Sequence, residues 1–243
     1  MPRPRTGGRV RPLLAAVLTT LAPLVFLTGP AQAAPAAAGA WTPAPAPVIS
    51  HVETDDPVVF ITIDDGWATE EAAGARQLLL DRRIPASLFL LPDAYERDRD
   101  YYRTLLAHGP SRIENHTTTH PDLTTLTEAE QRAEICGARD RQLAAFGDGP
   151  RLLRPAGGAT YNWPYHNADT RTAAPACGAE AIVMWTYDLT TWGSWTPPTP
   201  ELKAGDIVLL HMGPTLEADL TRALEAADAA GLSPAPLRDY LLG

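Results

Sequence analysis

The sequence has only one lysine, Lys203, and two cysteines in 243 residues. Two cysteines cannot form the disulfide framework of a small secreted scaffold. The 29 acidic residues outnumber the 20 lysines and arginines, and a chain with net charge −9 and a single lysine is a poor nucleic-acid binder. Apolar runs of the roughly 20 residues that a membrane span needs are also lacking, which excludes a polytopic membrane protein. The length and the 45% hydrophobic content instead allow one large or two small domains with a buried core.

Residues 1–33 have the three parts of a secretory signal peptide. Four arginines and no acid come first, an apolar stretch from Leu13 to Leu27 follows, and Ala31-Gln32-Ala33 forms an A-x-A cleavage site. The apolar stretch is too short to span a membrane, and Pro23 interrupts it. We therefore expect cleavage near Ala33, a secreted protein, and no stable membrane insertion afterwards. Cleavage would remove four basic residues and no acid, so the net charge would change from −9 to −13.

Residues 34–47 are rich in alanine and proline and carry no charge, which is typical of an extended linker. The folded domain is therefore expected over residues 48–243. Cys136 and Cys177 would lie in an oxidising compartment, which favours one disulfide between them. Two free, buried cysteines are the alternative, because the sequence gives no distance between the pair.

From Pro57 onwards, short apolar segments alternate with segments of helical periodicity. The predicted strands are 58–63, 86–91, 112–114, 151–153, 181–187 and 207–210. The predicted helices are 70–82, 99–108, 127–146, 167–177 and 216–230. The third of these helices begins with Thr127-Glu128-Ala129-Glu130, which is typical of a capping box. Regular alternation predicts a parallel sheet with right-handed crossovers, as in an α/β barrel or a doubly wound sheet.

Polar residues follow most of the predicted strands. Asp64 and Asp65 follow the first, His116 and His120 the third, Arg154 the fourth, Asp188 the fifth and His211 the sixth. Because the carboxyl ends of parallel barrel strands converge on one face, we expect these side chains to form a single site.

Asp65, His116 and His120 are the candidate metal ligands. Two adjacent carboxylates at a strand end point in different directions, so Asp65 can bind an ion while Asp64 faces substrate. The spacing of four between the histidines would place both imidazoles on one side of a helical turn, within reach of the same ion. Two histidines and one carboxylate leave positions open for water and substrate, which is typical of a catalytic metal site. Without such partners, Asp64-Asp65-Gly66 would be an ordinary capped loop and the histidines ordinary surface residues.

Five segments of the chain, in order, resemble the motifs of the NodB-homology polysaccharide deacetylases, carbohydrate esterase family 4. They are TIDDG at 62–66, HTTTH at 116–120, RPAGG at 154–158, WTYDLTTW at 185–192 and IVLLH at 207–211. The resemblance extends from about Val58 to Leu232. It implies a distorted (β/α) barrel of seven to eight strands and a divalent ion, usually zinc. Cobalt and nickel are alternatives, because ligand type alone does not select among the three metals.

The resemblance also assigns the chemical roles. Asp65, His116 and His120 would bind the metal. Asp64 would be the general base, and His211 the general acid that protonates the leaving group. This division fits the chemistry, because hydrolysis of an acetyl group needs a Lewis acid to polarise the carbonyl and a base to deprotonate water.

Five further residues receive supporting roles from the resemblance. Arg154 would orient the Asp64 carboxylate by a charge-assisted contact, and Asp188 would hold His211 in a similar way. The backbone N–H of Gly157 would complete an oxyanion hole. Trp192 and Leu209 would line the groove that receives the acyl methyl group.

Two positions depart from the family pattern. Gly157 stands where the family commonly has tyrosine, which removes an aromatic wall of the groove but keeps the backbone donor. Thr191 stands where a second aspartate is common. We expect both departures to affect the substrate range more than catalysis.

The sequence therefore predicts a secreted, single-domain, monomeric deacetylase that uses a metal-activated water on N- or O-acetyl groups of a polysaccharide. Chitin oligomers, peptidoglycan and acetylxylan all present the same acetyl group, and the motifs do not choose among them. One alternative is a metal-dependent amidase or phosphoesterase with the same ligands. A phosphate dianion would need more positive charge than the single Arg154 supplies. The other is a non-catalytic glycan-binding module that retains the barrel.

Overall fold

The computed structural model describes residues 43–157 and 165–243, and one compact unit spans Thr42–Gly243. The predicted signal peptide and most of the predicted linker lie outside the described residues. Ala46, which composition places in the linker, is instead 2% exposed and donates its N–H to the Arg171 carbonyl. The packed domain therefore begins about two residues earlier than predicted.

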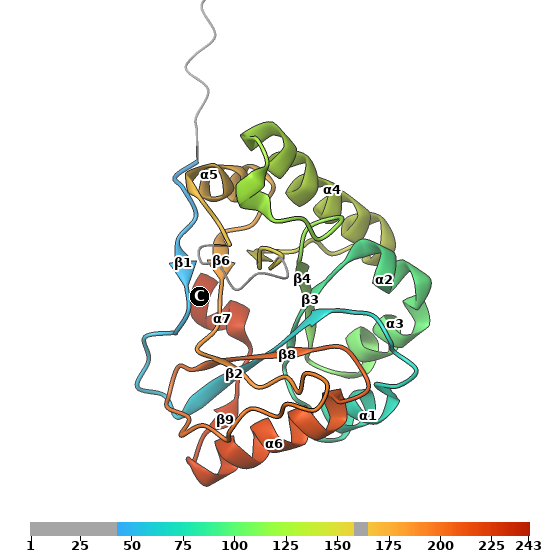
Figure 1. The fold of residues 1–243 in the computed structure, drawn as a ribbon, viewed down its shortest axis with the longest axis vertical. Coiled ribbons are helices and arrows are strands. Elements are labelled where there is room, and N and C mark those ends of the chain that lie inside the picture. The colour runs from blue at the N-terminus through green and yellow to red at the C-terminus, as the bar shows by residue number, and fades with distance from the viewer. Residues whose placement is uncertain (1–42, 158–164) are drawn as a thin grey trace, which may run out of the picture. The chain divides into compact units, whose positions relative to one another are not determined.

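A curled sheet of parallel strands forms the centre of the domain (Figure 1). The strands are β1 (Val48–Ile49), β2 (Val58–Asp65), β3 (Ser87–Leu90), β4 (Arg112–Asn115), β5 (Leu152–Leu153), β6 (Ala181–Val183), β7 (Tyr187–Asp188), β8 (Ile207–His211) and β9 (Ser233–Pro234). Their order is β1-β6-β5-β4-β3-β2-β8-β7, with β9 paired to β2. This arrangement confirms the predicted distorted α/β barrel.

The predicted strand 181–187 is wrong, because the chain forms two strands there. β6 and β7 lie near opposite ends of the strand order. Between them, the Met184 N–H donates to Ile49 of β1, and the Thr186 N–H donates to Ile207 of β8. Three residues span only about 10 Å, so residues 184–186 can connect the two sides only because the sheet curls back on itself.

Helices cover the outer face of this curled sheet. They are α1 (Ala73–Asp81), α2 (Pro92–Arg97), α3 (Arg99–His108), α4 (Glu128–Phe146), α5 (Ala168–Ala176) and α6 (Leu216–Ala229), with a 3₁₀ turn at Leu123–Thr125, whereas α7 (Leu237–Leu242) packs against the inner face of the sheet. The predicted capping box is confirmed, since Thr127 and Glu130 satisfy each other's backbone N–H at the start of α4. α2 and α7, of six residues each, were not predicted. Within the described residues, no helix is long and apolar enough to cross a membrane.

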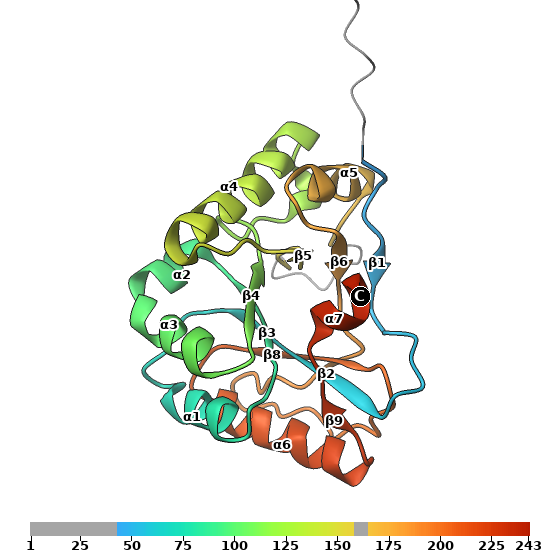
Figure 2. The ribbon, with the colours of Figure 1, turned by 180° about the vertical axis from the view of Figure 1, so that it is seen from behind.

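The alternation of side chains along β2 separates an outer core from the barrel interior. Val59, Ile61 and Ile63 pack outward in the cluster that also contains residues of α1, α3 and α6. Phe60 points inward and packs with Leu237 of α7, which closes the amino-terminal end of the barrel (Figure 2). Thr62 and Asp64 follow at the same period of two, so they face the interior and its carboxyl-terminal end.

The predicted disulfide is confirmed. Cys136 of α4 and Cys177 at the end of α5 are bonded, with their Cα atoms 4.8 Å apart. The bond joins two neighbouring outer helices next to the strand end that carries His116.

Candidate active site

The carboxyl ends of the strands surround a cleft of about 510 Å³. All of the predicted site residues except Arg154 line this cleft: Asp64, Asp65, His116, His120, Gly157, Asp188, Trp192, Leu209 and His211. Arg154 lies beneath its floor and is fully buried. The structure therefore brings these residues from separate strand ends together around one cleft.

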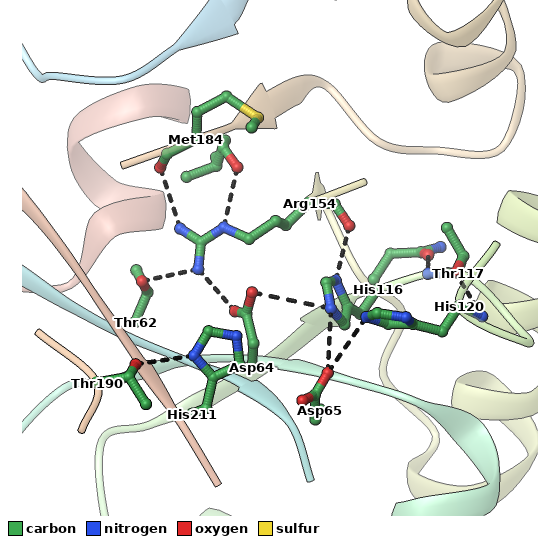
Figure 3. A network of polar contacts seen from close by, with 12 residues as sticks. Thr62, Asp64, Asp65, His116, Thr117, His120, Arg154, Met184, Thr190 and His211 are labelled. Atoms are coloured by element: carbon green, nitrogen blue, oxygen red, sulfur yellow. Dashed lines mark hydrogen bonds and ion pairs between the residues drawn. The ribbon is translucent and has the colours of Figure 1, made fainter. Parts of the chain in front are cut away.

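Arg154 holds the Asp64 carboxylate in a fixed position (Figure 3). Its NH1 atom lies 2.7 Å from Asp64 Oδ1 and 2.8 Å from the Thr62 hydroxyl. Nε and NH2 donate to the carbonyls of Val183 and Met184, each at 3.1 Å. The guanidinium also lies over the Phe89 ring, 4.3 Å from its centroid. Each guanidinium nitrogen of Arg154 thus donates a hydrogen bond, and the contact with Asp64 occupies only Oδ1, so Asp64 Oδ2 is left to face the cleft.

Asp65, His116 and His120 form a cluster with the geometry of a metal site. Their nearest ligand atoms lie within 4.8 Å of one another, and Asp65 Oδ1 is 3.4 Å from Nε2 of each histidine. The same oxygen is buried and has no hydrogen-bond partner among the described residues. Ligand atoms around a tetrahedral zinc at about 2.0–2.1 Å lie roughly 3.3 Å apart. The three residues therefore fit a divalent ion better than they fit one another as hydrogen-bond partners.

The neighbours of the triad set its electrostatics. Burial raises the pKa of Asp65, but contact with His116 and the charges of His211 and His120 lower it to about 2. Burial lowers the pKa of His116, yet the Asp64 and Asp65 carboxylates raise it above its ordinary value. Burial and the charge of His116 lower the pKa of His120, which favours a neutral imidazole with a free nitrogen. Two carboxylates beside His116 thus attract a cation to this point.

His116 is oriented by its other nitrogen. Nδ1 lies 2.9 Å from the Arg154 carbonyl, so a proton on Nδ1 leaves Nε2 free to coordinate. Arg154 therefore supports both halves of the site: its side chain fixes Asp64, and its backbone carbonyl fixes His116.

The predicted helical turn over 116–120 is wrong, although the two imidazoles do meet. This segment is a non-helical loop in which Thr117 and His120 have positive φ angles of 69° and 64°. The ring centroids of His116 and His120 are 5.0 Å apart. Asp65 also has a positive φ, 72°, so two of the three candidate ligands adopt a backbone conformation that is unusual for residues other than glycine.

Glu134 of α4 holds this loop in place. Its carboxylate accepts the backbone N–H groups of Thr118 and Thr119, at 2.9 and 2.8 Å, and the Thr119 hydroxyl at 2.9 Å. Asn115 accepts the Thr117 N–H at 2.8 Å. These bonds provide the local stabilisation that the positive φ angles require.

The predicted contact between Asp188 and His211 is not formed. His211 Nδ1 instead lies 2.8 Å from the hydroxyl of Thr190, which is 3% exposed. The Asp188 carboxylate turns back on its own chain and accepts the Thr190 N–H at 2.9 Å. This Asx turn uses Asp188 Oδ1, so Asp188 is linked to His211 through Thr190, whose N–H it accepts and whose hydroxyl contacts the imidazole.

The departure at Thr191 has a structural counterpart on α6. Asp219, which is fully buried, accepts the Thr191 N–H at 2.9 Å and the Thr191 hydroxyl at 2.5 Å. Arg222 lies 3.1 Å from the same carboxylate. A carboxylate does contact this segment, but it comes from a helix 28 residues further along the chain.

A neighbouring aromatic side chain explains why glycine stands at position 157. A Cβ placed on Gly157 would lie 3.0 Å from Cε1 of Tyr165. The Tyr165 ring therefore occupies the space beside residue 157, and it lines the cleft together with Trp185. Gly158, the last residue of the matched segment 154–158, lies outside the described residues.

Five further residues shape the site and carry no sequence signal that predicts it: Thr62, Asn115, Glu134, Thr190 and Asp219. Thr62 and Thr190 lie inside the matched motifs, where hydroxyl side chains carry no distinctive signal. Glu134 and Asp219 lie on helices, where a carboxylate normally indicates a solvated face. Only the burial of Asp219 and the direction of Glu134 reveal their roles.

The fold and the cluster together define a class: a curled parallel α/β barrel whose strand ends carry two histidines and a carboxylate beside an arginine-bound aspartate. The family model "Polysaccharide deacetylase" matches residues 51–182. The chain therefore belongs to the polysaccharide deacetylase family, carbohydrate esterase family 4, whose members are hydrolases acting on acetyl groups.

Individual relatives agree with this assignment. An uncharacterised protein of Streptomyces coelicolor is 37% identical over 96% of this chain and 99% of its own length. A chitooligosaccharide deacetylase of Rhizobium leguminosarum bv. phaseoli is 28% identical over 67% of this chain and 73% of its own. Among solved structures, a family 4 carbohydrate esterase from Bacillus anthracis has the same fold, with a TM-score of 0.64, 18% identity, and coverage of 80% of this chain and 87% of its own.

Proposed function

We propose that the protein is a secreted, zinc-dependent deacetylase that hydrolyses acetyl groups of a polysaccharide. The observation that carries the proposal is the position of Asp64. One of its oxygens is fixed by Arg154 at 2.7 Å, and the other lies 3.8 Å from Nε2 of the candidate ligand His116. A base held at this place is next to any water that enters the metal site.

Asp65, His116 and His120 would hold the ion. When bound, it supplies a Lewis acid that polarises the acetyl carbonyl and acidifies water. Asp64 Oδ2 accepts the proton of the attacking water, and the oxygen of that water forms the new bond to the carbonyl carbon. The Gly157 N–H donates to the carbonyl oxygen as negative charge develops. Acetate leaves when the bond to the sugar nitrogen or oxygen breaks.

His211 supplies the proton that the departing sugar group needs. Its ring lines the cleft, and Nδ1 is bound to the Thr190 hydroxyl at 2.8 Å. A hydroxyl can accept from a protonated Nδ1 and donate to an unprotonated one. Thr190 can therefore hold the same ring orientation before and after His211 gives up its proton.

The geometry disfavours the two rival functions. A phosphoesterase would need an exposed cation, whereas Arg154 is 0% exposed and each of its guanidinium nitrogens already donates a hydrogen bond within the protein. A non-catalytic module would have no use for an aspartate held by a buried arginine, which is costly to bury.

Asp64→Asn tests the proposal. We expect the variant to bind one equivalent of zinc, because the three ligands remain, and to lose nearly all acetate release from a chitooligosaccharide. Asp228→Asn, at an exposed position on α6, is the control. If Asp64→Asn retained most of the activity, Asp64 would not be the base.

Side-by-side assays on chitooligosaccharides, peptidoglycan and acetylxylan would identify the substrate, with chitooligosaccharides first because of the name of the Rhizobium relative. Detection of the mature chain outside the cell, beginning near residue 34, would test secretion. We expect a monomer.

A further inference from the structure

Two tryptophans form a small hairpin at the edge of the cleft. The Trp192 N–H donates to the Trp195 carbonyl and the Trp195 N–H to the Trp192 carbonyl, both at 2.9 Å. Gly193, at the turn between them, has a φ of 59° that glycine adopts without strain. The two indoles therefore belong to directly opposite residues, whose Cβ atoms lie about 5 Å apart in such pairs.

The base of this hairpin is fixed to the body of the domain. Thr191, next to Trp192, makes two hydrogen bonds to the buried carboxylate of Asp219. Arg222 binds the same carboxylate and also the carbonyl of Leu189. The hairpin is consequently oriented before any ligand arrives, so little ordering cost is added on binding.

The two indoles are the most exposed large apolar side chains of the described residues, Trp192 at 46% and Trp195 at 54%. Both line the cleft. The Trp192 ring contacts His211, with centroids 4.7 Å apart. Trp192 therefore belongs to the reacting centre, whereas the role of the Trp195 indole is not explained by the chemistry at the metal site.

We propose that Trp195 forms a second sugar subsite, which binds the pyranose ring adjoining the one that is deacetylated. This inference rests on the proposed function. The apolar C–H face of a pyranose suits an indole face, whose π system is negative. The subsite is continuous with the catalytic cleft, so one oligosaccharide can occupy both.

The two indoles together describe the occupant. Both line the same cleft, and Trp192 lies beside His211, so the reacting sugar and the neighbouring sugar on Trp195 belong to one ligand. The substrate class is therefore an acetylated oligosaccharide of at least two units.

Chain-length kinetics test this subsite. Acetate release would be measured on N-acetylglucosamine and on its β-linked oligomers of two to five units, using zinc-loaded protein. We expect kcat/KM of the wild type to rise from the monomer to the oligomers. Trp195→Ala should lower kcat/KM on the oligomers roughly 5- to 10-fold through KM, the size expected for one aromatic contact, and leave the monomer unchanged. Trp195→Phe should restore most of the loss.

Leu143→Ala is the matched control, because Leu143 is 43% exposed on α4 and does not line the cleft. It should behave as the wild type at every chain length. Equal kinetics of Trp195→Ala and wild type on the oligomers would overturn the subsite. An equal loss on the monomer would also overturn it, because that pattern indicates a disturbed catalytic centre.

Calorimetric binding of the tetramer to Asp64→Asn, with and without Trp195→Ala, separates the subsite from the reaction. We expect binding to weaken by the same factor as kcat/KM, and an unchanged Kd would overturn the inference. If the wild type released no acetate but bound the tetramer through Trp195, the proposed function would fail and the subsite would stand.

Discussion

Replacement of Arg154 by methionine should strongly destabilise the protein. The guanidinium is fully buried, and its NH1 atom is bound to Asp64 Oδ1 at 2.7 Å. Methionine has a similar length but no charge, so the Asp64 carboxylate would be left buried without its partner. Breaking a buried pair in this way costs about 3–5 kcal/mol. For a domain of about 200 residues, each kcal/mol lowers Tm by roughly 2–4 °C, so we expect Tm to decrease by about 6–20 °C.

Two companion variants show which part of the interaction matters. Arg154→Lys keeps the charge but cannot donate to both the Val183 and Met184 carbonyls, so its loss should fall between wild type and Arg154→Met. Asp64→Asn removes the negative charge, so it should recover part of the stability lost in Arg154→Met. Each free energy of unfolding would be measured by urea denaturation at neutral pH.

The double-mutant cycle of Arg154→Met and Asp64→Asn decides the question. We expect a coupling energy of about 2 kcal/mol, within the range for residues in direct contact. Additive effects, within about 0.5 kcal/mol, would refute the conclusion that the pair is electrostatically linked. Full stability of Arg154→Met alone would show that the buried guanidinium is not needed to compensate Asp64.

Three further changes should have measurable effects. The double variant Cys136→Ser/Cys177→Ser opens a loop of 41 residues and should lower the free energy of unfolding by about 4 kcal/mol, measured by urea denaturation. Glu134→Ala removes three hydrogen bonds from the loop between the histidines and should weaken zinc binding about 10- to 100-fold, measured by competition with a chelator. Removal of zinc with a chelator should lower the free energy of unfolding by about 2.7 kcal/mol relative to protein at a free zinc concentration 100 times the Kd, measured by thermal denaturation with and without added zinc.

Each of these changes has its own control. Reduction of the wild-type disulfide should have the same effect as the double serine variant, and stability that does not respond to reduction would contradict the prediction. Glu128→Ala, at an exposed position on the same helix, should leave zinc affinity unchanged. Asp65→Ala lacks one ligand, so its Tm should respond little to the chelator, and an equal response in wild type and variant would place the ion elsewhere.

The sequence predicted the barrel because the pattern of short apolar strands and amphipathic helices is strong over most of the domain. It also predicted the site, because residues at the ends of parallel strands must converge. The failure at 181–187 has a specific cause. Residues 184–187 continue the apolar and β-branched pattern, but Arg154 binds the carbonyls of Val183 and Met184. Those acceptors serve a buried side chain and not a neighbouring strand, and no local pattern contains this information.

The loop between the two histidines shows a second limit. A spacing of four residues is compatible with a helical turn, and the imidazoles do come together. They do so through positive φ angles at Thr117 and His120. Such angles depend on hydrogen bonds from Asn115 and from Glu134, and Glu134 lies 16 residues from Thr118 in the chain. The spacing therefore predicted the right contact for the wrong geometric reason.

The two departures from the family motifs are understandable only in three dimensions. At Gly157 the Tyr165 ring lies where a side chain would otherwise extend, and at Thr191 the carboxylate comes from Asp219 on α6. Gly157 leaves room for the Tyr165 ring, and Thr191 binds the Asp219 carboxylate. In both places the larger group comes from another part of the chain. The site is built from groups in space, so a chain can differ at a motif position and still have an aromatic ring in the cleft and a carboxylate bound to the motif segment.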